Sequence, residues 1–376
     1  MKLKQLQAHR FKSLRELTLP LRDLNLLIGA NAAGKSNVLD ALKFLSEAVE
    51  NRDFTPAIFS RGNIVQLAWK GEAANGIQLE TLFEDGAQEF KWSVQALRQG
   101  RDFLIEESLH RMSTGALPQM LLTANSGRGF WYTEDGQKFP LKMDPTKCAL
   151  AAAAPNEAFP GAAVARFVLG WMFCDPSPSY LRMPTPAQNE GVMFDSWGRN
   201  LAGRLLELQN NAPQVFARIS RAVRDILGVP ESIEAKSTQE GEIFLLQREA
   251  GLAFRIHQKG ASTGTLRMLA LMTALLGNTE ANLIGIEEPE NYIHPGALQA
   301  FAQYLREAAE QVQILVTTHS PLLLNYLDSP EAVCVVRRTP DGTKVEREHN
   351  PDAVRKALEE SGFGLGDLLE TKGFGA

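Results

Sequence analysis

Apolar residues recur along the chain at the spacings of strands and helices. Residues 1–28 are predicted to form strands separated by turns, and the last strand is the apolar run Leu24–Ile28. The apolar residues within Asn37–Ala48 instead follow helical spacing. A loop with two glycines lies between these segments, so the chain is predicted to begin as strand, loop and helix.

The middle of the chain changes its pattern several times. Short alternating runs over residues 64–143, several separated by Gly-containing turns, predict antiparallel strands. Residues 148–163 are rich in Ala and Pro and are predicted to be a linker, and a mostly helical stretch follows at 163–228. Strands are expected to return at 243–247 and 252–257.

The last third of the chain alternates buried strands with helices. Apolar strands are predicted at Ala281–Ile286 and Val312–Thr318, with helices at Thr265–Leu276 and Pro295–Glu310. Strand–helix–strand segments of these lengths are typical of a parallel α/β sheet. A strand at 332–337 and a polar, Gly-rich tail are expected to follow. The whole pattern predicts an α/β fold with a parallel core sheet, an antiparallel β subdomain and a helical lobe, without a long coiled coil.

Charge and cysteine content restrict the class of protein. The 376 residues carry a net charge of −5, which gives no overall attraction to nucleic acid. The three cysteines are far apart and form no C-x-x-C pair, which favours a reducing, cytoplasmic setting. No apolar stretch reaches the ~18 residues of a membrane helix, and the N-terminus has no apolar core of a signal peptide. A cytoplasmic protein without membrane partners is expected.

A phosphate-binding loop follows the apolar strand near the start of the chain. Residues Gly29–Ser36 fit the pattern G-x-x-x-x-G-K-[ST] without a gap. Backbone N–H groups of such a loop surround the β-phosphate at the positive end of the next helix. Lys35 would reach the β- and γ-phosphates, and Ser36 would hold Mg²⁺. The alternative is a chance Gly-Lys-Ser turn, but the strand before it and the helix after it favour nucleotide binding.

Two acidic residues come directly after an apolar strand near the end of the chain. Leu283–Ile286 is followed by Glu287 and Glu288, and an acid at the carboxyl end of a strand lies beside the phosphate loop in this kind of fold. Glu287 is therefore a candidate to hold Mg²⁺ through water, and Glu288 to orient or polarise the attacking water. A solvated acidic turn is the alternative, which the preceding apolar run disfavours.

Two further positions have both a functional and a structural interpretation. His319 follows a buried strand, where a neutral imidazole can hydrogen-bond the γ-phosphate or the water, although a lone histidine there is more often structural. Residues Ser262–Thr265 open a predicted helix and form either a second phosphate site or an ordinary N-cap. Because the chain has one phosphate loop, the second site would face the loop of a partner subunit.

These motifs, in this order, resemble those of the ABC-type ATPases of the RecF, SMC and OLD group, and most closely small RecF-like ATPases of the AAA family. The similarity covers about residues 1–46 and 259–337. His9–Leu14 is similar to the N-terminal strand of the group, and Ser262–Arg267 to its signature motif. Glu287–Pro295 resembles its Walker B motif and D-loop, and Thr317–Pro321 its switch histidine.

The resemblance implies an ATPase in which two head-to-tail heads enclose two ATP molecules. One head would supply the catalytic residues Glu288, His319 and Lys35 and the Mg²⁺ ligands Ser36 and Glu287. The cofactor-binding residues would be Gly29, Asn31, Gly34, Lys35, Ser36 and Asn37 of that head, with Ser262 and Gly264 of the other. ATP and Mg²⁺ are the expected cofactor and metal, and an ATP-dependent homodimer is the expected assembly.

The sequence departs from the pattern of this group at several points. Ala32-Ala33 replaces the usual Gly-Ser or Gly-Ala, which stiffens the loop, and Glu287 replaces the usual Asp, as in OLD-like members. The pattern does not identify the Q-loop glutamine: Gln66 and Gln78 are both candidates, and neither is assigned. The residues after 337 are too few for the C-terminal TOPRIM nuclease of OLD proteins.

Four consecutive segments are predicted from the pattern and the resemblance. Residues 1–150 form the N-terminal part of the ATPase lobe, 151–240 the helical lobe, 241–345 the C-terminal part of the ATPase lobe, and 346–376 a tail.

Two hypotheses for the biological role remain open. The first is an ATP-hydrolysing enzyme whose dimerisation gates action on DNA, in repair or in antiviral defence. The second is an ATP-dependent scaffold or sensor that controls a separate effector such as a nuclease, with slow hydrolysis. A transporter ATPase fits the motifs less well. Arg218, Arg221 and Arg224 share a helix face and could meet DNA, but a solvated face paired with Asp225 and Glu231 is the favoured interpretation.

Overall fold

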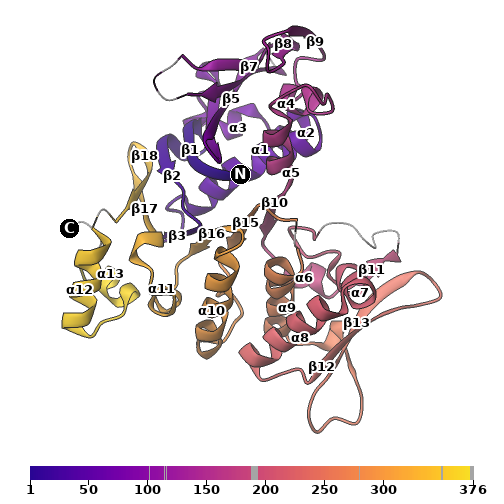
Figure 1. Ribbon diagram of the computed structural model, residues 1–376. Helices are drawn as coiled ribbons and strands as arrows, with labels where there is room; N and C mark the ends of the chain where they lie inside the picture. The colour runs from indigo at the N-terminus through magenta and orange to yellow at the C-terminus, as the bar shows by residue number, and fades with distance from the viewer. Residues whose placement is uncertain are drawn as a thin grey trace. The chain divides into compact units, whose positions relative to one another are not determined.

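The computed structural model describes residues 1–100, 102–113, 115, 117–187, 194–278, 280–348 and 350–372. The chain forms two compact units, and each gathers segments from distant parts of the sequence (Figure 1). The first unit contains residues 1–22, 29–171 and 334–346, and the second contains 23–28, 172–333 and 347–376. These two units group the chain differently from the four consecutive segments expected from the sequence. The four segments remain a prediction.

An eight-stranded antiparallel sheet dominates the first unit. Its strands follow the order β2-β1-β4-β5-β6-β7-β8-β9. They are β1 (Lys2–Phe11), β2 (Leu14–Pro20), β4 (Ile77–Asp85), β5 (Gln88–Gln99), β6 (Asp102–Met112), β7 (Gln119–Asn125), β8 (Arg128–Tyr132) and β9 (Lys138–Lys142). Along β4, every second residue from Ile77 to Phe83 is buried, the period of a sheet with one covered face. The antiparallel β subdomain is confirmed.

Several helices accompany this sheet, and one of them lies within the segment predicted to be a linker. They are α1 (Lys35–Glu50), α2 (Phe54–Phe59), α3 (Ile64–Leu67), α4 (Ala149–Ala153) and α5 (Ala162–Leu169). Residues 149–153 of this segment form the helix α4, which is largely buried, whereas residues 154–161 form turns. The Glu107 carboxylate of β6 accepts hydrogen bonds from the backbone N–H groups of Ala149 (2.6 Å) and Leu150 (2.9 Å). Burial raises the pKa of Glu107, although these bonds oppose the shift.

The second unit contains a parallel sheet with its strands in the order β10 (Trp171–Cys174), β15 (Leu283–Glu287), β16 (Gln313–Thr318) and β3 (Leu24–Ile28). β15 and β16 pair in parallel, as do β16 and β3. Both β16 and the apolar part of β15 are buried throughout, which explains their uninterrupted apolar sequences. The helices α9 (Thr263–Leu276), α10 (Leu298–Ala309) and α11 (Pro321–Leu327) accompany the sheet. The predicted parallel core is confirmed.

A helical region and a small antiparallel sheet complete the middle of the second unit. The helices are α6 (Pro178–Leu181), α7 (Leu201–Asn211) and α8 (Pro213–Leu227). Figure 1 shows α8 beside α9, with the strands β11 (Thr185–Pro186), β12 (Ser232–Ser237) and β13 (Glu242–Arg248) nearby. A short strand β14 (Ile256–His257) pairs with β13. The stretch predicted to be mostly helical at 163–228 therefore contains α7 and α8, together with the short strands β10 and β11. Of the strand predicted at 252–257, only the last two residues form β14.

The end of the chain is more ordered than the sequence pattern indicated. After β17 (Val333–Thr339) and β18 (Gly342–Arg347), the predicted tail forms α12 (Pro351–Ser361) and α13 (Leu365–Lys372). The Asn350 side chain caps α12, and α13 packs against α11. The longest described helix is α1 with 16 residues, so the described chain contains no long coiled coil. Over the same residues, no helix combines the length and apolarity needed to cross a membrane.

Candidate nucleotide-binding and hydrolysis site

The phosphate loop lies in the first unit and leads from the end of β3 into α1. α1 begins at Lys35, so the loop ends at a helix N-terminus with its partial positive charge. The Lys35 side chain is only 4% exposed. Its ammonium group donates to the carbonyl oxygens of Gly29 (2.8 Å) and Ala30 (3.1 Å). The lysine therefore holds the backbone of the loop while its charge stays at the loop's centre.

The glycines of the loop are required by close backbone approach. Gly34 has φ +108°, and a Cβ there would lie 2.0 Å from the Thr343 hydroxyl oxygen. A Cβ on Gly29 would lie 2.2 Å from the Val336 carbonyl oxygen. Ala32 has φ +60°, in the left-handed region where a non-glycine residue costs about 1–2 kcal/mol. Ala32 departs from the family pattern and therefore introduces local backbone strain into the loop.

A series of hydrogen bonds connects the phosphate loop to the turn after β1 and to β18. Asn37 Nδ2 donates to Ser13 Oγ (2.6 Å), and Ser13 Oγ lies 2.7 Å from Thr343 Oγ1. Thr343 Oγ1 in turn donates to the Ala33 carbonyl oxygen (2.9 Å). Asn37 was predicted to bind the cofactor, and the structure shows its amide holding the turn after β1. Sequence reasoning missed Thr343 because it lies about three hundred residues away without a motif of its own.

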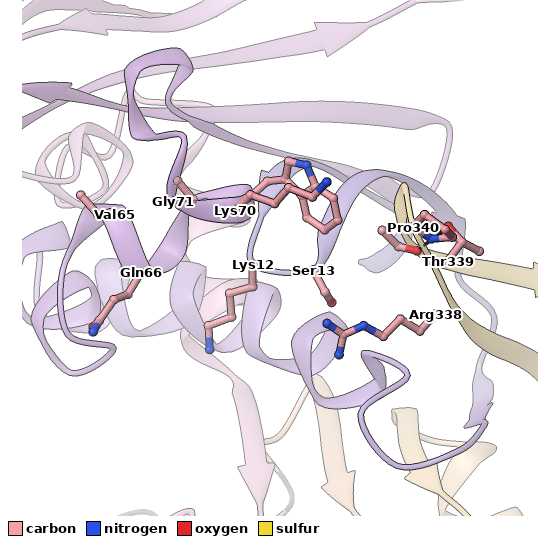
Figure 2. A pocket seen from close by; sticks show the side chains of 12 residues that line it. Lys12, Ser13, Val65, Gln66, Lys70, Gly71, Arg338, Thr339 and Pro340 are labelled. Atoms are coloured by element: carbon pink, nitrogen blue, oxygen red, sulfur yellow. Dashed lines mark hydrogen bonds between the residues drawn. The ribbon is translucent and has the colours of Figure 1, made fainter.

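A cavity of about 640 Å³ opens beside the loop within the same unit (Figure 2). Lys12, Lys70 and Arg338 line it together with the ring of Trp69. The Arg338 guanidinium reaches the Ala32 carbonyl oxygen of the loop at 3.5 Å. Among the described residues that line the cavity, none is acidic. The site next to the phosphate loop is thus basic and carries an aromatic face, a combination that suits a nucleotide.

A network of ion pairs holds the Lys12 side chain at this cavity. Its ammonium group lies 2.6 Å from Asp40 of α1, and Arg61 pairs with both Asp40 (2.7 Å) and Glu47 (2.5 Å). Burial would raise the pKa of Asp40, but the hydrogen bonds and charges of Arg61 and Lys12 outweigh burial and lower it. The carboxylate therefore stays charged and fixes the side of the cavity nearest to α1.

The two Q-loop candidates occupy different places. Gln66 lines the cavity, whereas Gln78 on β4 donates to Glu80 at 2.9 Å. These positions do not show which of the two is the Q-loop glutamine, so both remain candidates.

In the second unit, strand register aligns the ends of three strands along one edge of the parallel sheet. Glu287, the last residue of β15, pairs with Thr317, and Thr318 pairs with Ile28, the last residue of β3. His319 follows Thr318 directly, and Gly29 of the phosphate loop follows Ile28 in the chain. The carboxyl ends of β15, β16 and β3 therefore meet at this edge, where ligands bind in open α/β sheets.

The structure brings Glu288 and His319 together at this edge. His319 Nδ1 lies 3.6 Å from Glu288 Oε1. Asn291 Nδ2 donates to Glu288 Oε2 (2.9 Å), and the Glu288 N–H donates to the Thr317 carbonyl oxygen (2.9 Å). Glu288 has φ +40°, an unfavourable backbone for a residue with a side chain, which persists only where the surroundings enforce it. The carboxylate is 31% exposed and so remains open to water.

Ser262 and Gly264 lie where α9 begins. Ser262 Oγ accepts a hydrogen bond from the Thr265 N–H (3.0 Å), which is the ordinary N-cap weighed in the sequence analysis. A Cβ on Gly264 would lie 2.8 Å from the Tyr292 carbonyl oxygen, so the helix start packs closely on the acidic turn, residues 287–292. The predicted phosphate-binding role of both residues stays a prediction beside this structural one.

The predicted metal ligands are a hydroxyl and a carboxylate. Ser36 is exposed in the first turn of α1, and Glu287 ends β15. Both provide the hard oxygen atoms that Mg²⁺ prefers, and Mg²⁺ in nucleotide sites takes few protein ligands because phosphates and water complete its shell. The described residues include no group of three or more His, Cys, Asp and Glu side chains that could hold a metal by themselves. Asn31 is exposed in the loop and makes no contact that tests its predicted role.

Comparisons with known proteins agree with these motifs. Residues 1–90 match the family described as "AAA ATPase domain", and residues 178–325 match "AAA domain, putative AbiEii toxin, Type IV TA system". An OLD nuclease of Thermus scotoductus is 25% identical over 98% of this chain and 68% of its own length.

Solved structures show the same fold. An Smc head bound to the C-winged helix domain of ScpA has a TM-score of 0.54 at 16% identity, over 92% of this chain and 97% of its own. An Smc head with an extended coiled coil, bound to the C-terminal domain of ScpA derived from Pyrococcus furiosus, has a TM-score of 0.53 at 14% identity, over 96% and 99%. The fold is that of a P-loop NTPase of the ABC type, and the resemblance to the RecF, SMC and OLD group is confirmed.

Proposed function

We propose that the protein binds ATP with Mg²⁺ and hydrolyses the γ-phosphate. The observation that carries this proposal is the pairing of Glu288 with His319 at the sheet edge from which the phosphate loop continues. A carboxylate and an imidazole at that edge can act on a water molecule beside the terminal phosphate. The two ATPase families that match the chain support the same activity.

The first unit would hold the nucleotide. Backbone N–H groups of the loop and the start of α1 would bind the phosphates, with Lys35 at the β- and γ-phosphates. The basic cavity beside the loop suits the base and ribose, with the Trp69 ring as a stacking surface. Arg338 would add positive charge close to the loop, since it already reaches Ala32.

The second unit would supply the chemistry. Glu288 would orient and polarise the attacking water, because its carboxylate is partly exposed and its backbone is held in one conformation. His319 would hydrogen-bond the γ-phosphate or the water. Mg²⁺ would neutralise charge on the phosphates, and Ser36 and Glu287 are the residues that would hold it.

The resemblance and the position of α9 support a head-to-tail homodimer. Ser262 and Gly264 at the start of α9 would meet the nucleotide bound by the partner copy. The N-terminal dipole of α9 and its first backbone amides favour phosphate there.

For the biological role, we propose action in a DNA-related process in the cytoplasm, in repair or antiviral defence. The relative named as an OLD nuclease supports this role, and three buried cysteines that form no disulfide suit a reducing compartment. The alternative is an ATP-dependent scaffold or sensor that controls a separate effector such as a nuclease. The net charge of −5 favours a protein partner over extended DNA contact.

The arginine face of α8 gives DNA binding little support. Arg218, Arg221 and Arg224 are all exposed. Arg218 lies 3.7 Å from Glu307 of α10, and Glu231 lies 3.7 Å from Arg248. The predicted pairing with Glu231 is therefore wrong, because Glu231 lies at the start of β12 and faces Arg248. The interpretation as a solvated, ion-paired face still fits Arg218.

The test is steady-state ATP hydrolysis by the purified protein with and without double-stranded and single-stranded DNA. Stimulation by DNA, lost when all three α8 arginines become Ala, would favour the DNA-gated enzyme. Slow turnover that is indifferent to DNA would favour the scaffold. Absence of turnover above that of a Lys35→Ala variant would reject hydrolysis altogether.

A further inference from the structure

Glu290 is a buried carboxylate of the acidic turn, residues 287–292, and it contacts the turn that carries His319. Its side chain is 7% exposed. Its Oε1 accepts hydrogen bonds from Thr318 Oγ1 (2.7 Å) and from the His319 backbone N–H (2.9 Å). The same oxygen lies 3.3 Å from His319 Nδ1. One carboxylate oxygen therefore contacts the backbone and the ring of the same histidine.

The Thr318 hydroxyl connects Glu290 to a second residue next to His319. This hydroxyl donates to Glu290 and accepts from the Ser320 N–H (3.0 Å). The residues on both sides of His319 are thus connected to Glu290. The turn between β16 and α11 is held to the acidic turn at a single carboxylate oxygen.

The contact with the ring has a chemical consequence. A carboxylate only accepts hydrogen bonds, so Oε1 of Glu290 at 3.3 Å favours the ring form with a hydrogen on Nδ1, and Oε1 of Glu288 at 3.6 Å favours the same form. A hydrogen-bond partner on one ring nitrogen fixes the tautomer and the orientation of an imidazole. Nε2 is then the ring nitrogen available to a nucleotide or to water.

A role in fold stability alone does not account for this arrangement. Burial of a carboxylate is costly, and Oε2 of Glu290 has no hydrogen-bond partner among the described residues. A group of this kind is poorly explained as a stabilising element, and unsatisfied buried groups are often found where function requires them.

We propose that Glu290 is a positioning residue that fixes the orientation and tautomer of His319. The proposal deepens the hydrolytic function proposed above and rests on it. Glu290 would not touch the nucleotide. It would act through His319, so its removal should slow the chemical step and leave ATP binding almost unchanged.

The kinetic test uses Glu290→Ala, Glu290→Gln, His319→Ala and the double variant Glu290→Ala/His319→Ala. Loss of an orienting partner typically costs about 10–100-fold in activity, so we expect kcat of Glu290→Ala to fall at least about tenfold with KM for ATP within about twofold. Glu290→Gln retains a neutral acceptor and should lie between Glu290→Ala and wild type. In the double variant, loss of Glu290 should add no further decrease to that of His319→Ala.

A matched control separates this role from loss of any buried carboxylate. Glu107→Gln replaces a buried carboxyl group of β6 that accepts hydrogen bonds from the first N–H groups of α4 in the first unit. It should lower stability without the selective decrease in kcat. An equal decrease in kcat for Glu107→Gln, or a further decrease in the double variant, would overturn the positioning role.

A spectroscopic test does not depend on turnover. Nitrogen NMR of ¹⁵N-histidine-labelled protein reports which ring nitrogen of His319 carries the hydrogen, with His319→Ala used to assign the signal. Wild type should show a hydrogen on Nδ1, and Glu290→Ala should show a mixture of tautomers. Identical His319 signals in the two proteins would overturn the proposal even if hydrolysis is confirmed. A wild-type protein without turnover would instead reject the hydrolytic function, and the NMR result would still decide the role of Glu290.

Discussion

The Arg267 guanidinium of α9 donates to the main-chain carbonyl oxygen of Glu288 at 3.0 Å. The same nitrogen donates to the Glu287 carbonyl oxygen (3.2 Å), and the other terminal nitrogen donates to that of Pro176 (2.6 Å). Arg267 is 3% exposed, so these bonds are shielded from water. The helix that begins with Ser262 is therefore connected directly to the acidic turn, and a change at the start of α9 can reach Glu288.

Replacing this arginine should affect both stability and turnover. In Arg267→Met, buried carbonyl groups lose their donors, and we expect the free energy of unfolding to fall by about 2–3 kcal/mol. ATP turnover should fall more than the unfolded fraction explains, because the Glu288 backbone is released. Arg204→Met is the control, since Arg204 donates to the Gly277 carbonyl oxygen at the other end of α9. Denaturant unfolding and turnover, measured on both variants, should separate them. Equal turnover in the two would contradict the connection.

The cavity beside the phosphate loop predicts a role for an aromatic ring. Stacking on an aromatic side chain contributes about 1–3 kcal/mol per base, so Trp69→Ala should weaken ATP binding roughly tenfold. Isothermal titration with a slowly hydrolysed ATP analogue measures this change. Trp197→Ala, an exposed tryptophan of the second unit, serves as the control and should bind normally. Unchanged affinity in Trp69→Ala would place the base elsewhere.

The start of α9 allows a test of the head-to-tail dimer. Ser262→Arg should block ATP-dependent dimerisation and leave ATP binding by one copy intact. Ser262→Ala removes the same cap, at a cost of about 1 kcal/mol, without adding bulk or charge. Sedimentation with ATP in the Glu288→Gln background should show dimers for Ser262→Ala only. Dimers of Ser262→Arg would refute the contribution of this surface.

The network beneath the cavity predicts a pH dependence of stability. The pKa of Asp40 is lowered in the folded protein, because Arg61 and Lys12 outweigh the effect of burial. A lowered pKa means that the stabilisation is present above the unfolded value of 3.8 and is lost as pH falls through the folded value. Asp40→Asn should therefore lower the free energy of unfolding by about 1–3 kcal/mol near pH 7. The difference from wild type should shrink below about pH 4. A pH-independent difference would argue against a charged Asp40.

The sequence predicted those parts of the site that depend on local pattern. Glu287 ends an apolar strand and Glu288 and His319 follow apolar strands, and in the structure Glu288 and His319 lie close together. Long-range contacts gave no such signal. Glu290 appears as a further acid in a polar turn, and only the folded chain places it against Thr318 and His319.

Segments without a regular pattern were the least predictable. The first part of the Ala-rich segment, residues 149–153, became a helix whose first N–H groups are bound by Glu107, 42 residues before Ala149. The tail formed two helices, one of which packs on α11. In both cases tertiary contacts outweighed local composition, which a single sequence does not reveal.

The most direct test of the central claim compares Glu288→Gln with wild type in ATP binding and in steady-state turnover. The substitution keeps the shape of the side chain and removes the carboxylate charge. We expect unchanged ATP affinity and turnover lowered by about 10²–10⁴-fold, the usual contribution of a general base. Near-normal turnover by Glu288→Gln would contradict the assignment of Glu288 and the account of hydrolysis built on it.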